Sequence, residues 1–181
     1  LHLTRKNSYV GPAWYSKEVD IPSGWKEKAI ELKLERVIWQ TSVWVDGKQV
    51  EGMQESLVAP HLYDLTEHLT PGKHKITIRV DNRKRYDITA GDMAHAYTNQ
   101  TQIMWNGIIG EIALTAKDAV SIRNLQAYPD YKNKQVKVKC LVNNTGAATS
   151  GSLNADIRTA TDPVIQVQQH VTLQPGENRL E

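Results

Sequence analysis

The feature that most constrains this chain is the shortness of its hydrophobic repeats. Apolar and polar residues alternate over short runs, and Gly, Pro, Asp and Asn separate these runs. We find no window of about 11 or more residues that repeats apolar positions at the helical period. Alternation places every second side chain on one face of a strand, so the sequence predicts an all-β protein with antiparallel sheets.

The first part of the chain contains several such runs. Asp46-Gly47 is a strong hairpin signal, because both residue types tolerate a positive φ. Asp64 is expected to cap one helical turn over 64–69. We expect strands at 13–21, 29–37, 43–45, 48–50, 74–80 and 108–116. Regular short strands of this kind suggest a sandwich or a jelly roll.

A boundary is expected at Lys117-Asp118, because no Trp occurs beyond it. This divides the chain into domains 1–117 and 118–181. Four further strands are predicted at 120–128, 135–142, 152–158 and 164–173. An immunoglobulin-like sandwich needs about seven strands, so four indicate a truncated second domain.

Composition argues against several function classes. The net charge of +2 over 181 residues argues against a nucleic-acid partner, and the apolar runs are too short to span a membrane. The six His residues lack metal-ligand spacing, and no cofactor motif is present. We therefore expect no metal and no cofactor. The single Cys140 has no internal disulfide partner and is expected to be a small buried residue.

The stretch 93–112 carries the candidate binding residues. Its only charged residue is Glu111, and it combines amides and a His with aromatic side chains. Amides donate and accept hydrogen bonds together, and an aromatic face covers the apolar side of a sugar ring. This predicts contact with a neutral, hydroxyl-rich ligand through His95, Asn99, Gln100, Gln102, Trp105 and Asn106. The alternative is that Trp105 is core and the amides tie down a loop, with Asn106-Gly107 as a structural turn.

Two other features leave alternatives open. Trp39 and Trp44 lie five residues apart, so in one regular strand they would face opposite sides. Either one is exposed, as on a carbohydrate platform, or a bulge at 40–42 buries both. The run Arg83-Lys84-Arg85 would suit an anionic sugar, although such runs are more often solvated loops.

Residues 9 to 116 contain, in order, GPAWYSKEVDIP, LERV, VWVDGKQV, PHLYDLTEHLTPGKHKITIRVDN and WNGIIGEIAL. This combination resembles the N-terminal sugar-binding domain of glycoside hydrolase family 2, which includes β-galactosidases, β-glucuronidases and β-mannosidases. The segment from 118 onward resembles the start of the immunoglobulin-like domain that follows in that family. The resemblance implies a jelly-roll (galactose-binding-like) sandwich followed by a partial immunoglobulin-like sandwich.

The resemblance also implies a larger parent enzyme. In the family, two Glu residues on a later TIM-barrel domain hydrolyse the O-glycosidic bond, so no catalytic residue carries over to this chain. We expect a non-catalytic fragment, inactive alone, whose partners are a carbohydrate substrate and its own C-terminal barrel. Family enzymes often form oligomers, so a homo-oligomer of the full-length protein is also expected. A polysaccharide-degrading parent suits the bacterial periplasm or the extracellular space, although the lack of disulfides also fits the cytoplasm.

In the β-galactosidase branch, the loop before the W…G-I motif contacts sugar hydroxyls at the barrel. The matching residues here are Asn99, Gln100 and Gln102, ahead of Trp105 and Asn106. That branch can carry an acidic residue in this loop, whereas this chain is neutral there, so the sugar stays undetermined. Two other functions remain open, a free-standing lectin-like module and a purely structural domain.

Overall fold

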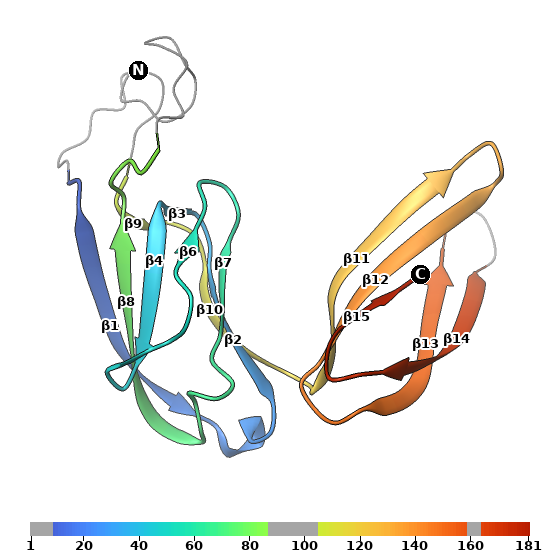
Figure 1. Ribbon diagram of the computed structural model, residues 1–181, viewed down its shortest axis with the longest axis horizontal. Coiled ribbons are helices and arrows are strands. Elements are labelled where there is room, and N and C mark those ends of the chain that lie inside the picture. The colour runs from blue at the N-terminus through green and yellow to red at the C-terminus, as the bar shows by residue number, and fades with distance from the viewer. Residues whose placement is uncertain (1–8, 87–104, 159–163) are drawn as a thin grey trace, which may run out of the picture. The chain divides into compact units, whose positions relative to one another are not determined.

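The computed structural model describes residues 9–86, 105–158 and 164–181. Contacts divide the chain into two compact units, Leu1–Ala116 and Lys117–Glu181. Strands dominate both units (Figure 1), and the helical structure in the described residues is the short 3-10 turn η1 (Ser23–Trp25). The predicted all-β class is therefore confirmed. None of the helical structure described is long and apolar enough to cross a membrane.

The larger sheet of the first unit is antiparallel and has the order β1-β8-β4-β5, with β6 also paired to β4. Its strands are β1 (Pro12–Ile21), β4 (Gln40–Val45), β5 (Lys48–Gln49), β6 (Gln54–Glu55) and β8 (Gly72–Asp81). Alternation sets its two faces. Ile76, Ile78 and Val80 point inward and are at most 6 % exposed, as the sequence predicts.

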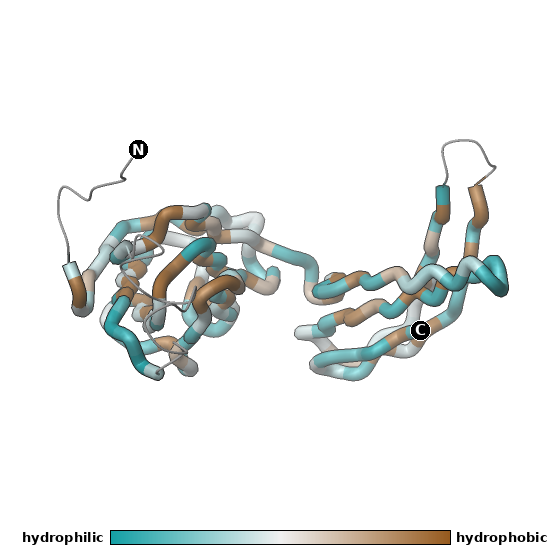
Figure 2. Tube along the Cα trace, turned by 90° about the horizontal axis from the view of Figure 1, so that it is seen from above, coloured by the Kyte–Doolittle hydropathy of each residue, from teal (hydrophilic) through white to brown (hydrophobic). Residues whose placement is uncertain are grey.

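A second layer of three strands, in the order β10-β2-β7, covers that inner face. It consists of β2 (Ala29–Leu34), β7 (His61–Asp64) and β10 (Ile112–Lys117), and the short pair β3 (Val37–Ile38) and β9 (Gly107–Ile108) adds to the unit. Leu32 and Leu34 contribute to one buried cluster with the inward residues of the larger sheet. Apolar and polar residues alternate along the strands (Figure 2), as expected for a two-layer sandwich.

The predicted hairpin is confirmed, and the predicted helical turn over 64–69 forms as a hydrogen-bonded turn rather than a helix. The β4–β5 hairpin turns at Asp46 (φ 50°) and Gly47 (φ 81°), the pair of positive φ values that a tight hairpin needs. The turn after β7 has a hydrogen bond from the Leu69 amide to the Leu65 carbonyl, and the Asp64 carboxylate caps it by accepting from the Thr66 amide at 2.9 Å.

Two predicted strands are wrong in their length. The run 29–37 is interrupted, because Arg36 adopts a positive φ of 52° between β2 and β3. The run 108–116 is interrupted in the same region, between β9 and β10, where the Gly110 amide donates to the Glu35 carbonyl at 3.1 Å. Glu31, expected on the solvent side, is only 9 % exposed, since β2 is the central strand of its layer.

The second unit has two antiparallel sheets, β11-β12-β15 and β13-β14. Its strands are β11 (Val120–Asp130), β12 (Gln135–Asn144), β13 (Thr149–Ile157), β14 (Ile165–Leu173) and β15 (Gly176–Leu180). The sequence missed β15, whose mostly polar GENRL run is held by pairing with β12. Cys140 is 4 % exposed and packs with Val142 and Leu173, as expected of a small buried residue.

Candidate functional site

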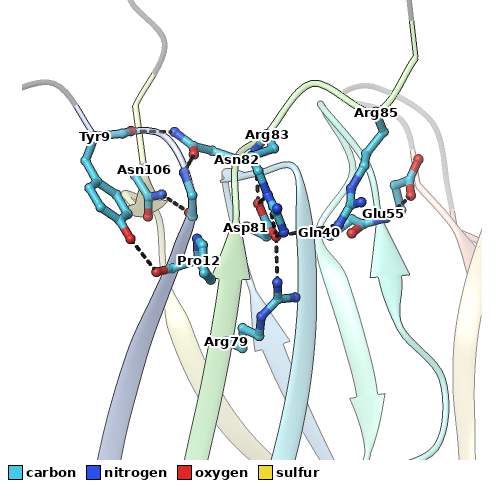
Figure 3. Close-up of polar contacts among 11 residues, drawn as sticks. Tyr9, Pro12, Gln40, Glu55, Arg79, Asp81, Asn82, Arg83, Arg85 and Asn106 are labelled. Atoms are coloured by element: carbon cyan, nitrogen blue, oxygen red, sulfur yellow. Dashed lines mark hydrogen bonds and ion pairs between the residues drawn. The ribbon is translucent and has the colours of Figure 1, made fainter.

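The site lies at the end of the first unit where β8 ends and β1 begins (Figure 3). Asn82 follows β8 directly and is 2 % exposed. Its Oδ1 accepts a hydrogen bond from the Gly11 amide at 2.9 Å. Its Nδ2 donates to the carbonyls of Tyr9 and Trp105, each at 3.0 Å. One side-chain amide therefore joins the chain before β1, the end of β8 and the chain before β9.

Asn106 adds a second hydrogen bond to the same region. Its Nδ2 donates to the Gly11 carbonyl at 2.7 Å. With the bond from Asn82, both polar groups of the Gly11 backbone are paired to side-chain amides. Gly11 has a φ of 143°, a backbone conformation that L side chains rarely adopt. We call Gly11, Asn82, Trp105 and Asn106 the amide clamp.

Beside the amide clamp, three arginines surround the carboxylate of Asp81, which is fully buried. The Arg83 Nε lies 2.9 and 3.1 Å from the two carboxylate oxygens, and Arg79 lies 2.6 Å away. Arg85 is more distant, at 3.5 Å. Hydrogen bonds from Arg83 hold the pKa of Asp81 well below its usual range, against the opposing effect of burial. The cluster keeps an excess of positive charge.

Two further contacts complete this end. Gln40 donates from Nε2 to the Glu55 carboxylate at 2.6 Å. Tyr86, the last described residue before 105, is 60 % exposed and packs edge-on against Trp39, with ring centroids 6.1 Å apart. Tyr86 and Trp105 therefore mark the two described ends that border residues 87–104, and both are tied to the sandwich.

Of the two alternatives for Trp39 and Trp44, the structure agrees with the one in which a single ring is exposed. Trp39 precedes β4 and is 3 % exposed, whereas Trp44 lies within β4 on the outer face and is partly exposed. Pairing of β4 with β8 runs without interruption from Gln40–Asp81 to Val45–Ile76, so the bulge considered at 40–42 is absent.

The interior of the unit also contains a polar cluster between β4 and β7. Thr41 Oγ1 lies 2.6 Å from His61 Nδ1 and 2.8 Å from the Tyr63 hydroxyl, which also donates to the Thr41 carbonyl at 2.6 Å. His61 is 1 % exposed. Burial lowers the pKa of His61, with the Ser56 backbone and the Glu55 charge acting in the opposite direction. A neutral imidazole therefore fits this position. Its role is structural, because it joins the two layers.

Comparison with known proteins identifies the architecture. Residues 2–117 match the family model described as "Glycosyl hydrolases family 2, sugar binding domain". The chain belongs to this family. No group of three or more His, Cys, Asp or Glu side chains suited to a metal ion occurs among the described residues of this sugar-binding domain and the unit that follows it.

Solved structures support the same fold. A β-glucuronidase from Bacteroides uniformis matches 95 % of this chain with a TM-score of 0.73 at 19 % identity. A putative β-galactosidase from Bacteroides fragilis matches 97 % with a TM-score of 0.72 at 18 % identity. This chain covers only 21 % and 27 % of those two proteins. At such identities the likeness establishes the fold alone.

The predicted binding residues of this family 2 sugar-binding domain fall into two groups. His95, Asn99, Gln100 and Gln102 lie outside the described residues. Trp105 and Asn106 lie at the amide clamp, where a main-chain carbonyl and a side-chain amide hold the backbone. The indole Nε1 of Trp105 and the Oδ1 of Asn106 are buried without a hydrogen-bond partner in the described part of the chain.

Sequence reasoning did not single out Gly11, Asp81 or Asn82 as parts of the site. The available signal was local, an Asp-Asn pair directly after an alternating strand. The contact between Asn82 and Gly11 depends on the pairing of β1 with β8, which joins residues about 70 positions apart. The run Arg83-Lys84-Arg85 was considered as a site for an anionic sugar. In the structure, Arg83 is bound to Asp81 and is not a free anion-binding group.

Proposed function

We propose that this chain is the non-catalytic, sugar-binding part of a family 2 glycosidase. In this proposal, the segment 87–104 contributes Asn99, Gln100 and Gln102 to an active site on a separate TIM-barrel domain. The barrel hydrolyses O-glycosidic bonds in β-galactoside-like substrates, and the amide side chains bind the outer hydroxyls of the sugar. The full-length protein is then the enzyme, and this chain alone is inactive.

The observation that best supports the proposal is the amide clamp. Asn82 follows β8 and holds the carbonyl of Trp105, which precedes β9, so the two ends that border 87–104 share a fixed base. The hydrogen bond from the Gly11 amide ties this base to the start of β1. Side chains presented from a fixed base lose less conformational freedom when they bind. A rigid sandwich is therefore suited to positioning hydrogen-bond partners rather than to supplying chemical power.

The part of the segment that carries the candidate residues, 93–104, supports a neutral substrate. Residues 93–104 contain no Lys, Arg, Asp or Glu, and each neutral hydrogen bond contributes about 1 kcal/mol net. Relatives in solved structures are named as β-glucuronidases and as a putative β-galactosidase. Arg79 and Arg83 are bound to Asp81, so the preference for galactosides over glucuronides rests on the neutral residues 93–104 and not on the arginines.

The first test uses the native protein from its source, detected with an antibody against this chain. A mass several times 20.4 kDa is expected, followed by hydrolysis of aryl β-galactosides in preference to β-glucuronides and β-mannosides. In that full-length enzyme, Asn99→Ala and Gln102→Ala should each lower kcat/KM about 5-fold, the effect of about 1 kcal/mol. The matched control is Asn154→Ala, an exposed amide of β13 in the second unit.

Each outcome has a clear meaning. A native mass near 20.4 kDa would remove the barrel and leave a free-standing carbohydrate-binding module. Unchanged kinetics in Asn99→Ala and Gln102→Ala would reduce the domain to a structural role. Hydrolysis of a glycoside by the purified 181-residue chain would contradict its non-catalytic assignment.

A further inference from the structure

Two tryptophans meet on the outer face of the larger sheet. Trp14 on β1 pairs in register with Arg79, and Trp44 on β4 pairs with Thr77. Since β8 lies between β1 and β4, the two rings come together across the outer side of β8. Their centroids are 5.1 Å apart, and the ring planes are inclined by 42°.

This pair is not part of the hydrophobic core. The core lies on the opposite face, where Val43, Ile78 and Val80 are buried. Trp14 is 58 % exposed. Two tryptophan rings in contact outside the core, one of them mostly in water, form a joined aromatic surface that is open to a ligand.

Polar groups suited to sugar hydroxyls flank the aromatic pair. The hydroxyls of Ser16 and Thr77 lie 3.2 Å apart on the same face; Ser16 is on the strand of Trp14, and Thr77 pairs with Trp44. Arg79, opposite Trp14, is held in place by the buried Asp81 carboxylate. Such a fixed guanidinium offers N–H donors at little entropic cost. An aromatic surface beside fixed donors and hydroxyls matches the two sides of a pyranose ring, apolar C–H groups and hydroxyls.

The face also leads toward the amide clamp. Successive residues of β8 on this side are Thr77, Arg79 and Asp81, each about 7 Å further along the strand, and the arginines cover the buried Asp81 carboxylate. Asn82 follows directly. A ligand that extends along this row therefore runs from the tryptophans toward the end of the unit where residues 87–104 are joined.

We propose that the outer face of β1, β8 and β4 is a second carbohydrate site, a platform for the sugar rings of a glycan chain. Trp14 and Trp44 cover the C–H faces of the sugar rings, and Ser16, Thr77 and Arg79 bind hydroxyls. The site takes oligosaccharides in preference to monosaccharides, because several rings share the platform. It uses no residue of 87–104, so it does not depend on the role proposed for that segment.

The test is binding of defined oligosaccharides to the 181-residue chain, measured by isothermal titration calorimetry and by tryptophan fluorescence. The probes are β-1,4-linked galactotetraose and mannotetraose, with galactose and mannose as their monosaccharide counterparts. At least one tetrasaccharide should bind with a Kd below about 1 mM, and the monosaccharides more weakly. Trp14→Ala and Trp44→Ala should each weaken this binding about tenfold or more, as expected for an aromatic anchor.

Two variants separate binding from folding. Trp14→Tyr keeps an aromatic face and should retain binding within a few-fold. Tyr131→Ala removes an even more exposed aromatic (83 % exposed) from the second unit and should bind as the parent chain does. Thermal unfolding of all variants identifies any loss of binding that comes from loss of structure.

The proposal is overturned if neither tetrasaccharide binds, or if Trp14→Ala and Trp44→Ala bind as the parent chain does. It is also overturned if another domain covers the face in the full-length protein. N-bromosuccinimide, which oxidises exposed indoles, should modify Trp14 in the native enzyme, and tetrasaccharide should protect it. Complete resistance of Trp14 without sugar would show that protein, not glycan, occupies the platform.

Discussion

Asn82 shows how one side chain can organise the end of a sandwich. Its amide forms three hydrogen bonds, to Gly11, Tyr9 and Trp105, and it is nearly inaccessible to water. A side chain that only accepts or only donates cannot serve both the Gly11 amide and two carbonyls. The choice of Asn at this position therefore follows from the mixture of donors and acceptors around it.

Replacement of Asn82 by Ala should accordingly destabilise the first unit by about 2–4 kcal/mol, because buried backbone groups would be left unpaired. Asn106→Ala, which removes one hydrogen bond to Gly11, should cost less, about 1–2 kcal/mol. Urea denaturation of both variants provides the comparison, with Asn154→Ala as the exposed amide control. If Asn82→Ala unfolds at the same urea concentration as Asn154→Ala, the amide clamp does not contribute to stability.

At the level of elements, the break between β9 and β10 contributes to the packing of the first unit as the strands do. Gly110 lies so close to the neighbouring chain that an added Cβ would be 2.5 Å from the Glu35 carbonyl oxygen. The obstacle is backbone, so it cannot rotate away as a side chain does. This close approach allows Gly110 and Glu111 to hydrogen-bond with Glu35 across the interruption.

Gly110→Ala is therefore expected to lower the free energy of unfolding by about 1–3 kcal/mol, since the chain must shift to admit the methyl group. Gly24 offers a matched control, because an added Cβ there meets nothing within 4 Å. Gly24→Ala should change stability by less than about 0.5 kcal/mol. Equal stabilities of the two variants in urea or thermal unfolding would contradict the close approach at Gly110.

For the whole molecule, buried titratable groups set the dependence of stability on pH. The pKa of His61 is lowered in the folded state, so below the ordinary value of 6.5 the unfolded chain binds a proton that the folded chain does not. Stability is full above pH 6.5 and falls as the pH decreases below it. The pKa of Asp81 is also lowered, so its contribution is present above 3.8 and is lost as the pH falls below that value.

Unfolding free energy measured between pH 7.5 and about 5 should therefore decrease, with a slope of at most about 1.4 kcal/mol per pH unit for one site. His61→Asn, which retains a polar group near Thr41, should flatten this slope. Asn154→Ala, an exposed amide of β13, should leave it unchanged. The same slope in the parent chain and in His61→Asn would assign the acid sensitivity to other groups.

Local pattern was sufficient for much of the architecture. Alternation at Ile76, Ile78 and Val80 predicted both a strand and its buried face, because the period of two is a property of the strand itself. Asp46-Gly47 predicted its hairpin for the same reason, since the required φ values belong to two adjacent residues. The motif order also predicted the family that the family model identifies.

Other features depend on residues that are distant along the chain. Arg36 looks like an ordinary polar residue within a run of 29–37, yet packing against the β9–β10 segment imposes a positive φ and divides the strand. Strand β15 forms because β12 offers it a partner, which its own polar sequence does not reveal. Likewise, Trp14 and Trp44 are 30 positions apart, and only the shared neighbour β8 brings their rings together.

The amide clamp also combines a feature that local sequence predicts with one that depends on distant residues. Composition singled out the stretch 93–112, because a neutral run rich in amides and aromatics is a local property of the sequence. Composition did not distinguish a side chain that binds a sugar from one that binds the protein. In the structure, the Asn106 amide binds the protein, because it donates to the Gly11 carbonyl. That choice depends on which backbone groups lie within hydrogen-bond distance, and long-range strand pairing places them there.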